Sequence, residues 1–201
     1  MLENSSHMQD TLTVNDRIAE RVRDLRAARR LSLAALAQRS GVSRSMISLI
    51  ERAESSPTAV LLERLAAGLD VPVATLFEVP EPEAGPIARA SEQTPWRDPE
   101  SGYVRRTVSP GGHVSPIQIA EISFPAGARV AYETGGRDAI VHQQVWVLEG
   151  AIDVTVGSER HRLGEGDCLA LVLDLPIVYS NPTAATARYA VVIASEPRAW
   201  R

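Results

Sequence analysis

Lysine is absent from this 201-residue chain, and cysteine occurs only once, at Cys168. A single cysteine excludes an internal disulfide and a zinc site built from several cysteines. No apolar run approaches the roughly 18 residues needed to cross a bilayer, and no charged-then-apolar leader opens the chain, so a cytoplasmic location is expected. Residues 1–8 resemble sequence introduced by a cloning vector, which would place the natural start at Met8.

All 21 basic side chains are therefore arginines, and they are unevenly distributed. Between Arg17 and Arg52, nine arginines stand against three acids, a local charge of +6, whereas residues 79–201 hold 11 arginines and 15 acids, a local charge of −4. The planar fork of arginine matches phosphate and guanine edges. The distribution favours contact of the first segment with nucleic acid, and the alternative is a solvated helix surface.

A change of composition divides the chain into two parts. Residues 79–86 contain three prolines and one glycine, which neither a helix nor the interior of a sheet accepts. The pattern predicts a helical domain at 14–78, a linker at 79–87 and a β domain at 88–201.

Five helices are expected in the first domain, because cap residues alternate there with apolar residues at helical spacing. The signals are Asn15 or Asp16 before the first helix, Ser32 before the second, Gly41 at its end, Ser43 before the third, Ser56-Pro57 opening the fourth, Gly68 ending it and Pro72 opening the fifth. The second domain shows short apolar runs between prolines and glycines, which predict strands of an antiparallel sandwich or barrel. The runs are Tyr103–Val108, Ile117–Phe124, Ile140–Leu148, Ile152–Val156, Cys168–Leu173 and Arg188–Ile193.

The stretch from Ser32 to Arg52, SLAALAQRSGVSRSMISLIER, has the layout of a capped helix, a tight turn and a second capped helix. Together with Ser56-Pro57-Thr58, Leu65-Ala66 and Leu76-Phe77 it resembles the phage-repressor-like (XRE) helix-turn-helix family. The resemblance implies a lambda-repressor-like fold that binds an operator in double-stranded DNA, with the third helix in the major groove. The sequence differs from the family at Ala53, where glycine is usual, and at Glu54, where a base is frequent.

The resemblance also implies roles for single residues of this segment. Arg44 and Ser45 would face base edges, with Arg44 able to bind guanine bidentately, and Ser48 and Leu49 would lie one turn further along. Ser32 and Ser43 would place helix N-termini at phosphates, where Arg39 and Arg52 add positive charge. For the two serines, helix capping alone is the alternative.

The β domain resembles a small cupin (jelly-roll) barrel. The segments that carry this resemblance are Val145–Gly150, Val154–Val156, Leu163–Asp167 and Pro176–Asn181. The expected fold class is thus an α+β two-domain protein, a five-helix helix-turn-helix domain followed by an all-β cupin barrel. In such regulators the barrel senses a small molecule.

Metal-dependent cupins supply two histidines and a glutamate from one motif and a further histidine from another. The corresponding positions here include Gln143 and Ile177, which are poor metal ligands, so neither a metal nor another cofactor is expected. His142 should point to the opposite face of its strand, and His113 and His161 lack partners at ligand spacing. Without a metal, a pocket would be lined by apolar residues with a few polar groups to orient a metabolite. The candidates for effector binding are Tyr132, Arg137, Gln143 and Tyr179.

Two of these assignments have structural alternatives. Arg137 lies in a Gly-Gly-Arg-Asp turn and could be solvated instead. Cys168 is expected to be a small buried apolar residue rather than a redox switch, since no second cysteine exists.

Residues 143–148 carry apolar side chains on both faces of one expected strand, so the face with Trp146 and Leu148 must also be covered. The other sheet edge, the helical domain or a partner subunit could cover it. A homodimer is preferred, because paired half-sites are read by two-fold proteins. These observations favour a transcription regulator without enzymatic activity, with repression preferred over activation. The alternatives are a metal-dependent oxidase or epoxidase carrying the same helical domain, and a barrel that only dimerises.

Overall fold

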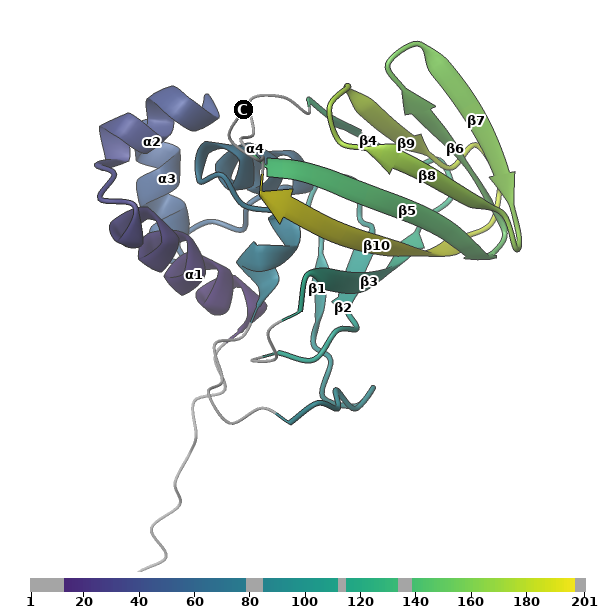
Figure 1. Ribbon diagram of the computed structural model, residues 1–201, viewed down its shortest axis with the longest axis horizontal. Helices are drawn as coiled ribbons and strands as arrows, with labels where there is room; N and C mark the ends of the chain where they lie inside the picture. Colours follow the sequence, from purple (N-terminus) through teal and green to yellow (C-terminus); the bar gives the residue numbers. More distant parts are fainter. Residues whose placement is uncertain (1–12, 79–84, 112–114, 134–138, 198–201) are drawn as a thin grey trace, which may run out of the picture.

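The computed structural model describes residues 13–78, 85–111, 115–133 and 139–197. The helical domain lies at one end of the molecule and two antiparallel sheets at the other (Figure 1). Its elements are α1 (Val14–Ala28), α2 (Leu33–Ser40), α3 (Arg44–Glu51), α4 (Ala59–Gly68) and the 3₁₀ helix η1 (Val73–Phe77). No helix among the described residues is long and apolar enough to cross a membrane.

Side-chain caps define where the four α-helices begin. Ser32 accepts a hydrogen bond from the Ala35 backbone nitrogen, and Ser43 accepts one from Met46, as the sequence predicted. Gly41 ends α2 in the left-handed conformation with φ +68°. The predicted caps of the first and fourth helices were wrong by a few residues.

Thr13, rather than Asn15 or Asp16, caps α1, because Thr13 and Asp16 form a reciprocal capping box. Thr58, rather than Ser56, caps α4 through the Leu61 backbone nitrogen. The expected fifth α-helix is the short η1, since its cap position is Pro72, whose side chain makes no capping bond. The domain therefore has four α-helices, not five.

The turn after α3 holds a non-glycine residue in a conformation that favours glycine. Ala53 has φ +56°, and this is the position where the family usually has glycine. Holding an L-residue in the left-handed region costs about 1–2 kcal/mol. Glycine avoids this cost, but it loses more backbone entropy on folding, which cancels about half of the gain. We expect Ala53→Gly to raise the free energy of unfolding by about 0.5–1 kcal/mol, measured by urea denaturation. An unchanged or lower stability would contradict this account of the turn, and Ala67→Gly, inside α4, is the control that should destabilise.

The described residues of the second domain form ten strands. They are β1 (Pro95–Arg97), β2 (Val104–Thr107), β3 (Ile117–Phe124), β4 (Arg129–Tyr132), β5 (Ala139–Glu149), β6 (Ala151–Val156), β7 (Glu159–Gly164), β8 (Cys168–Val172), β9 (Ile177–Ser180) and β10 (Ala187–Pro197). One sheet has the order β1-β2-β3-β10-β5-β8 and the other β4-β9-β6-β7.

Among the described residues no ladder joins the two sheets, so the domain is a two-sheet structure rather than the closed barrel that was expected. Alternation along β5 places Val145 and Val147 in the core, whereas Trp146 is 49% exposed on the outer face. Cys168 pairs with Trp146 across β5 and β8 and shares that outer face. The expectation of a buried cysteine was therefore wrong, because Cys168 begins an edge strand and points outward.

Aromatic rings form a continuous series of contacts through the interior, although aromatic residues make up only 4% of the chain. Edge-to-face and stacked contacts, with centroids 5.5–6.1 Å apart, connect Phe77, Trp96, Tyr103, Phe124, Tyr189, Tyr179 and Tyr132. Because Phe77 belongs to η1 and the others to the strands or the residues beside them, the series joins the two domains.

Polar contacts also join the domains. Asp98, which is 1% exposed, accepts a hydrogen bond of 2.9 Å from the Ala59 backbone nitrogen at the first turn of α4. Glu78, after η1, pairs with Arg21 of α1 at 2.8 Å and also accepts a hydrogen bond from Gln118 of β3. The helical domain is thus held against the sheets by both ends of the α4–η1 segment.

Candidate functional sites

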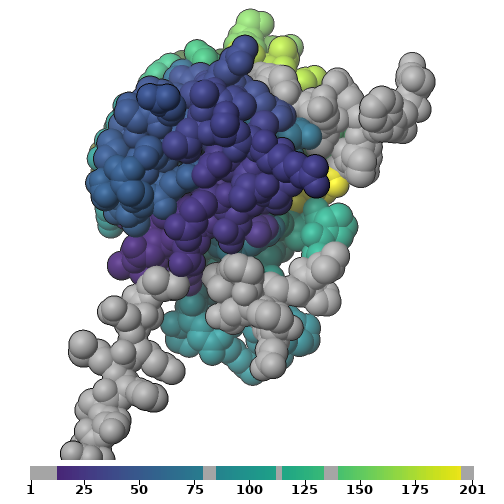
Figure 2. Space-filling view, turned by 90° about the vertical axis from the view of Figure 1, so that its left-hand side faces the viewer, coloured from purple at the N-terminus to yellow at the C-terminus, as the bar shows by residue number. Residues whose placement is uncertain are grey.

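The first candidate site is the exposed start of α3. Ser43, Arg44 and Ser45 are all exposed, while Ile47 and Ile50 on the opposite side are buried in the helical core. Viewed from the helical end, the purple and blue helices fill the near face and the green and yellow strands lie behind them (Figure 2). The first turn of α3 therefore presents an arginine and two serines to the surroundings.

A buried ion pair fixes the far end of the same helix. The Arg26 guanidinium of α1 donates to both Glu51 carboxylate oxygens, at 2.6 and 2.7 Å, and to the Leu31 carbonyl oxygen at 2.9 Å. Glu51 is 8% exposed at the last residue of α3. The hydrogen bonds to Glu51 raise the pKa of Arg26 above its usual value. The pair positions α3 relative to α1, a role for Arg26 that the sequence analysis missed.

The remaining candidates for nucleic-acid contact differ in their surroundings. Arg39 is exposed at the end of α2, and Ser48 and Leu49 are half-buried on α3. Arg52 is exposed but is already paired, with its Nε atom 2.7 Å from the Glu54 carboxylate, and it also bonds the Ser48 hydroxyl. The charge of Arg52 is therefore partly neutralised by Glu54, which weakens the attraction between Arg52 and a DNA phosphate.

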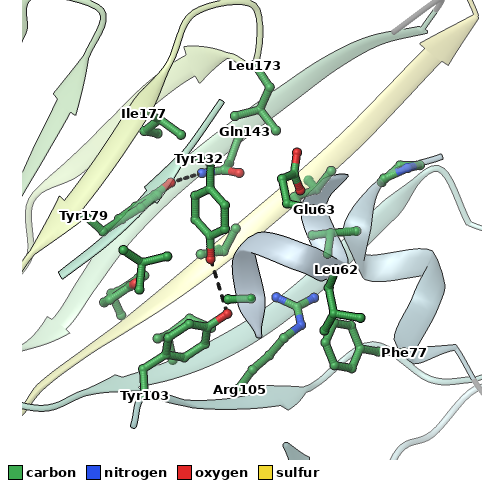
Figure 3. Close-up of a pocket in the computed structure, with 18 of the residues that line it drawn as sticks. Leu62, Glu63, Phe77, Tyr103, Arg105, Tyr132, Gln143, Leu173, Ile177 and Tyr179 are labelled. Atoms are coloured by element: carbon green, nitrogen blue, oxygen red, sulfur yellow. Dashed lines mark hydrogen bonds between the residues drawn. The ribbon is translucent and has the colours of Figure 1, made fainter. Parts of the chain in front are cut away.

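The second candidate site is a cavity between the two domains, with a volume of about 60 Å³. Its walls come from α4 and η1 on one side and from strands of both sheets on the other (Figure 3). Most of the lining is apolar, and the polar groups are Glu63, Tyr103, Arg105, Tyr132, Gln143, Tyr179 and Tyr189.

Three of the four predicted effector residues meet in this cavity. The amide nitrogen of buried Gln143 donates a hydrogen bond to the Tyr179 hydroxyl, and the Tyr132 hydroxyl lies 3.3 Å from the Tyr103 hydroxyl. Burial raises the pKa of Tyr103 to about 12 and moves those of Tyr132 and Tyr179 upward as well, so all three phenols are neutral near pH 7. Arg137, the fourth, lies outside the described residues, as does His113.

The cavity also contains three polar residues that were not predicted from the sequence, Arg105, Tyr103 and Glu63. Arg105 is 6% exposed, and its guanidinium carbon lies 4.9 Å from the centre of the Phe77 ring. Side chains alternate along β2, so Arg105 lies on the same face as Tyr103. The spacing of these two residues in the sequence could have predicted this. The contribution of Glu63 from α4 depends on how the domains meet, which no local pattern encodes.

Ile177, at a position where metal-dependent cupins have a ligand, also lines the cavity. No group of three or more histidine, cysteine or acidic side chains suited to a metal occurs within the described ranges. His142 is exposed on β5, opposite in direction to Gln143, as alternation predicted, and the ring nitrogen of His161 lies 3.8 Å from Glu159.

Comparison with known proteins agrees with this architecture. Residues 22–76 match the family model described as helix-turn-helix, HTH_3. A crystal structure of an HTH_3 family transcriptional regulator from Vibrio cholerae shares 29% identity, covers 92% of this chain and 98% of its own, and superposes with a TM-score of 0.74. Residues 22–76 therefore form a helix-turn-helix domain of the kind that the HTH_3 model describes.

Two curated relatives are similar over most of the chain. The HTH-type transcriptional regulator SutR of Escherichia coli is 27% identical over 84% of this chain and 89% of its own length. The regulator PuuR of the same organism is 24% identical over 84% of this chain and 90% of its own. The similarity thus extends beyond the helical domain into the β domain.

Proposed function

We propose that the protein is a cytoplasmic, DNA-binding transcription repressor that acts as a homodimer and responds to a small effector bound by its C-terminal domain. The observation that carries the DNA-binding part is the exposed first turn of α3, Ser43 to Ser45, within a helix-turn-helix domain. Arg44 reads base edges, and the helix N-termini at Ser32 and Ser43 contact phosphates together with Arg39 and Arg52. Similarity to proteins named transcriptional regulators supports the proposal. The helical domain spans 14–78 and the effector domain 88–201, joined by a linker at 79–87.

The test of DNA binding begins with selection of an operator from a random duplex library, followed by fluorescence anisotropy on the operator and on a scrambled duplex. We expect the operator to bind more tightly by a factor of about 10³ or more, with affinity falling as salt rises. Equal affinity for both duplexes at low salt would contradict the proposal. A reporter gene behind the operator then distinguishes repression from activation.

The homodimer is supported by the outer face of the larger sheet. Strands β3, β10, β5 and β8 are neighbours in that sheet, and their outward positions are largely apolar. Ile117 is 50% exposed, Trp146 49% and Val172 36%. An apolar sheet face of this kind indicates a protein interface. A two-fold dimer would hold two α3 helices for half-sites about 34 Å apart.

We expect Trp146→Glu to weaken dimerisation by about 30-fold or more, because a charge replaces a large aromatic anchor at the centre of the interface. Sedimentation equilibrium over a concentration series measures this. Leu175→Glu is the matched control, since Leu175 is 49% exposed and lies against Gly157, between β6 and β7 of the other sheet. A monomeric wild-type protein, or equal effects of the two variants, would overturn the assignment of the interface.

The residues that line the cavity support a regulatory role rather than a catalytic one. Gln143 and Ile177 occupy positions that bind the metal in metal-dependent cupins, and an amide and a hydrocarbon are poor ligands for a divalent cation. The tyrosines and Gln143 instead suit the orientation of an organic effector. An effector can change the affinity for DNA only if it binds one arrangement of the two domains more tightly than another.

A further inference from the structure

The cavity between the domains contains a charged side chain, Arg105, that forms no ion pair with any residue the structure describes. Arg105 is 94% buried, since 6% of it is exposed, and its Nε atom finds no hydrogen-bond partner in the part of the chain that the structure describes. Its guanidinium contacts the Phe77 ring at 4.9 Å and lies on the side of the cavity where the Tyr103 hydroxyl is found (Figure 3). Neighbouring Arg106 points to the other face of the strand and pairs with Glu121 at 2.7 Å.

A buried guanidinium that no carboxylate contacts directly is electrostatically unfavourable, and Glu63 of the same cavity attracts Arg105 only through space. Removing the cation from water disfavours its charged form, and burial lowers the pKa of Arg105 accordingly. A carboxylate is the natural complement, because its two oxygens match the planar donor fork. The neutral phenols of Tyr103 and Tyr132 can donate further hydrogen bonds to such an anion.

The rest of the lining specifies the body of the ligand. Apolar side chains surround the space, including Leu62, Val130, Val141, Ile177, Val191 and Ile193. A cavity of about 60 Å³ has room for about four to six water-sized groups. The Glu63 carboxyl lines the same cavity, so a second carboxylate on the ligand would face an acid. These features together suit a short aliphatic chain with one acidic group.

We propose that the cavity binds a short-chain monocarboxylate, with its carboxylate on Arg105 and its hydrocarbon chain among the apolar side chains. The inference rests on the proposed effector function and names the class of effector. Because α4 and η1 form one wall, the bound anion contacts both domains at once. The guanidinium that would hold the anion lies over the Phe77 ring of η1, which links ligand binding to the position of the helical domain.

The test is isothermal titration calorimetry of the full chain with the sodium salts from acetate to hexanoate, at neutral pH and constant ionic strength. The corresponding primary amides are the neutral controls, and inorganic phosphate tests for an anion without a hydrocarbon chain. We expect one site per chain, with optimum binding at propionate or butyrate and at least about tenfold weaker binding of the amides and of phosphate.

Two variants assign the site. Arg105→Met keeps the volume of the side chain and removes its charge, and it is expected to weaken butyrate binding by at least about tenfold while melting no lower than the wild-type protein. Arg106→Met, one residue along, should leave butyrate binding unchanged. Equal losses in both variants would overturn the assignment to Arg105.

The experiments can contradict the proposed class of ligand and the proposed regulatory function independently of each other. If no carboxylate binds at millimolar concentrations, or if amides or phosphate bind as well as carboxylates, the inference is wrong even where operator binding is specific. If butyrate binds through Arg105 but the operator is not preferred over a scrambled duplex, the ligand class stands and the proposed function fails. A carboxylate that binds through Arg105 and changes operator affinity supports both.

Discussion

Replacing Arg26 by methionine is expected to lower the free energy of unfolding by about 3 kcal/mol, which corresponds to a fall in melting temperature of about 6–12 °C. The substitution removes both hydrogen bonds to Glu51 and leaves that carboxylate 8% exposed without its cation. A buried charge that loses its partner is far more costly than a broken surface pair, which is worth about 0–1 kcal/mol. Urea denaturation followed by circular dichroism measures the effect.

A double-mutant cycle separates the ion pair from packing. Glu51→Leu alone should also destabilise, since it leaves the Arg26 guanidinium, with a side chain 19% exposed, facing an apolar residue. The double variant Arg26→Met with Glu51→Leu should recover to within about 1 kcal/mol of the wild-type protein, because no unpaired charge remains. Single variants that each cost less than about 0.5 kcal/mol would show that water screens the pair as it screens a surface salt bridge.

Arg44→Ala is expected to weaken binding to the selected operator by about 1–3 kcal/mol, or about 5- to 150-fold. Arg44 is exposed on the first turn of α3, where a guanidinium can form two hydrogen bonds to one guanine. The loss on a scrambled duplex should be much smaller, because nonspecific binding depends on phosphate charge. Fluorescence anisotropy on the two duplexes measures the difference.

Two further arginines provide controls for Arg44. Arg129→Ala, at an exposed position of β4, should change neither affinity. Arg39→Ala should lower affinity on both duplexes and reduce the salt slope by about 1, as expected for a phosphate contact. If Arg44→Ala lowers both affinities equally, Arg44 is also a phosphate contact and does not read sequence.

The helical domain could largely be predicted from the sequence, because short-range chemistry determines its helix ends. Ser32, Gly41 and Ser43 act within a few residues of their own position, and each lies where the cap pattern placed it. The pairing of Arg26 with Glu51 could not be predicted in the same way, since 25 residues separate them and any of the nine arginines between Arg17 and Arg52 fits the pattern equally well.

The β domain was predicted less completely. The long apolar strand Ile117–Phe124 has the predicted bounds, whereas β1, β4, β7 and β9 were missed because they are short or rich in charged residues. Gln143 could be identified as an inward-facing polar residue from alternation along its strand. Tyr132 and Tyr179 were predicted only as polar candidates for the pocket, because the strands that carry them were missed. The cavity itself depends on α4 and η1 closing over the sheet, a long-range contact that periodicity within strands does not encode.

The position of α4 and η1 has a practical consequence for work on this protein. A C-terminal fragment excised at the linker would lack Leu62, Glu63 and Phe77, and its cavity would become an open apolar trough filled with solvent. The matching N-terminal fragment would expose the ring of Phe77 and the side chain of Leu62, and it would tend to self-associate. Compound screening and crystallisation with ligands therefore require the intact polypeptide.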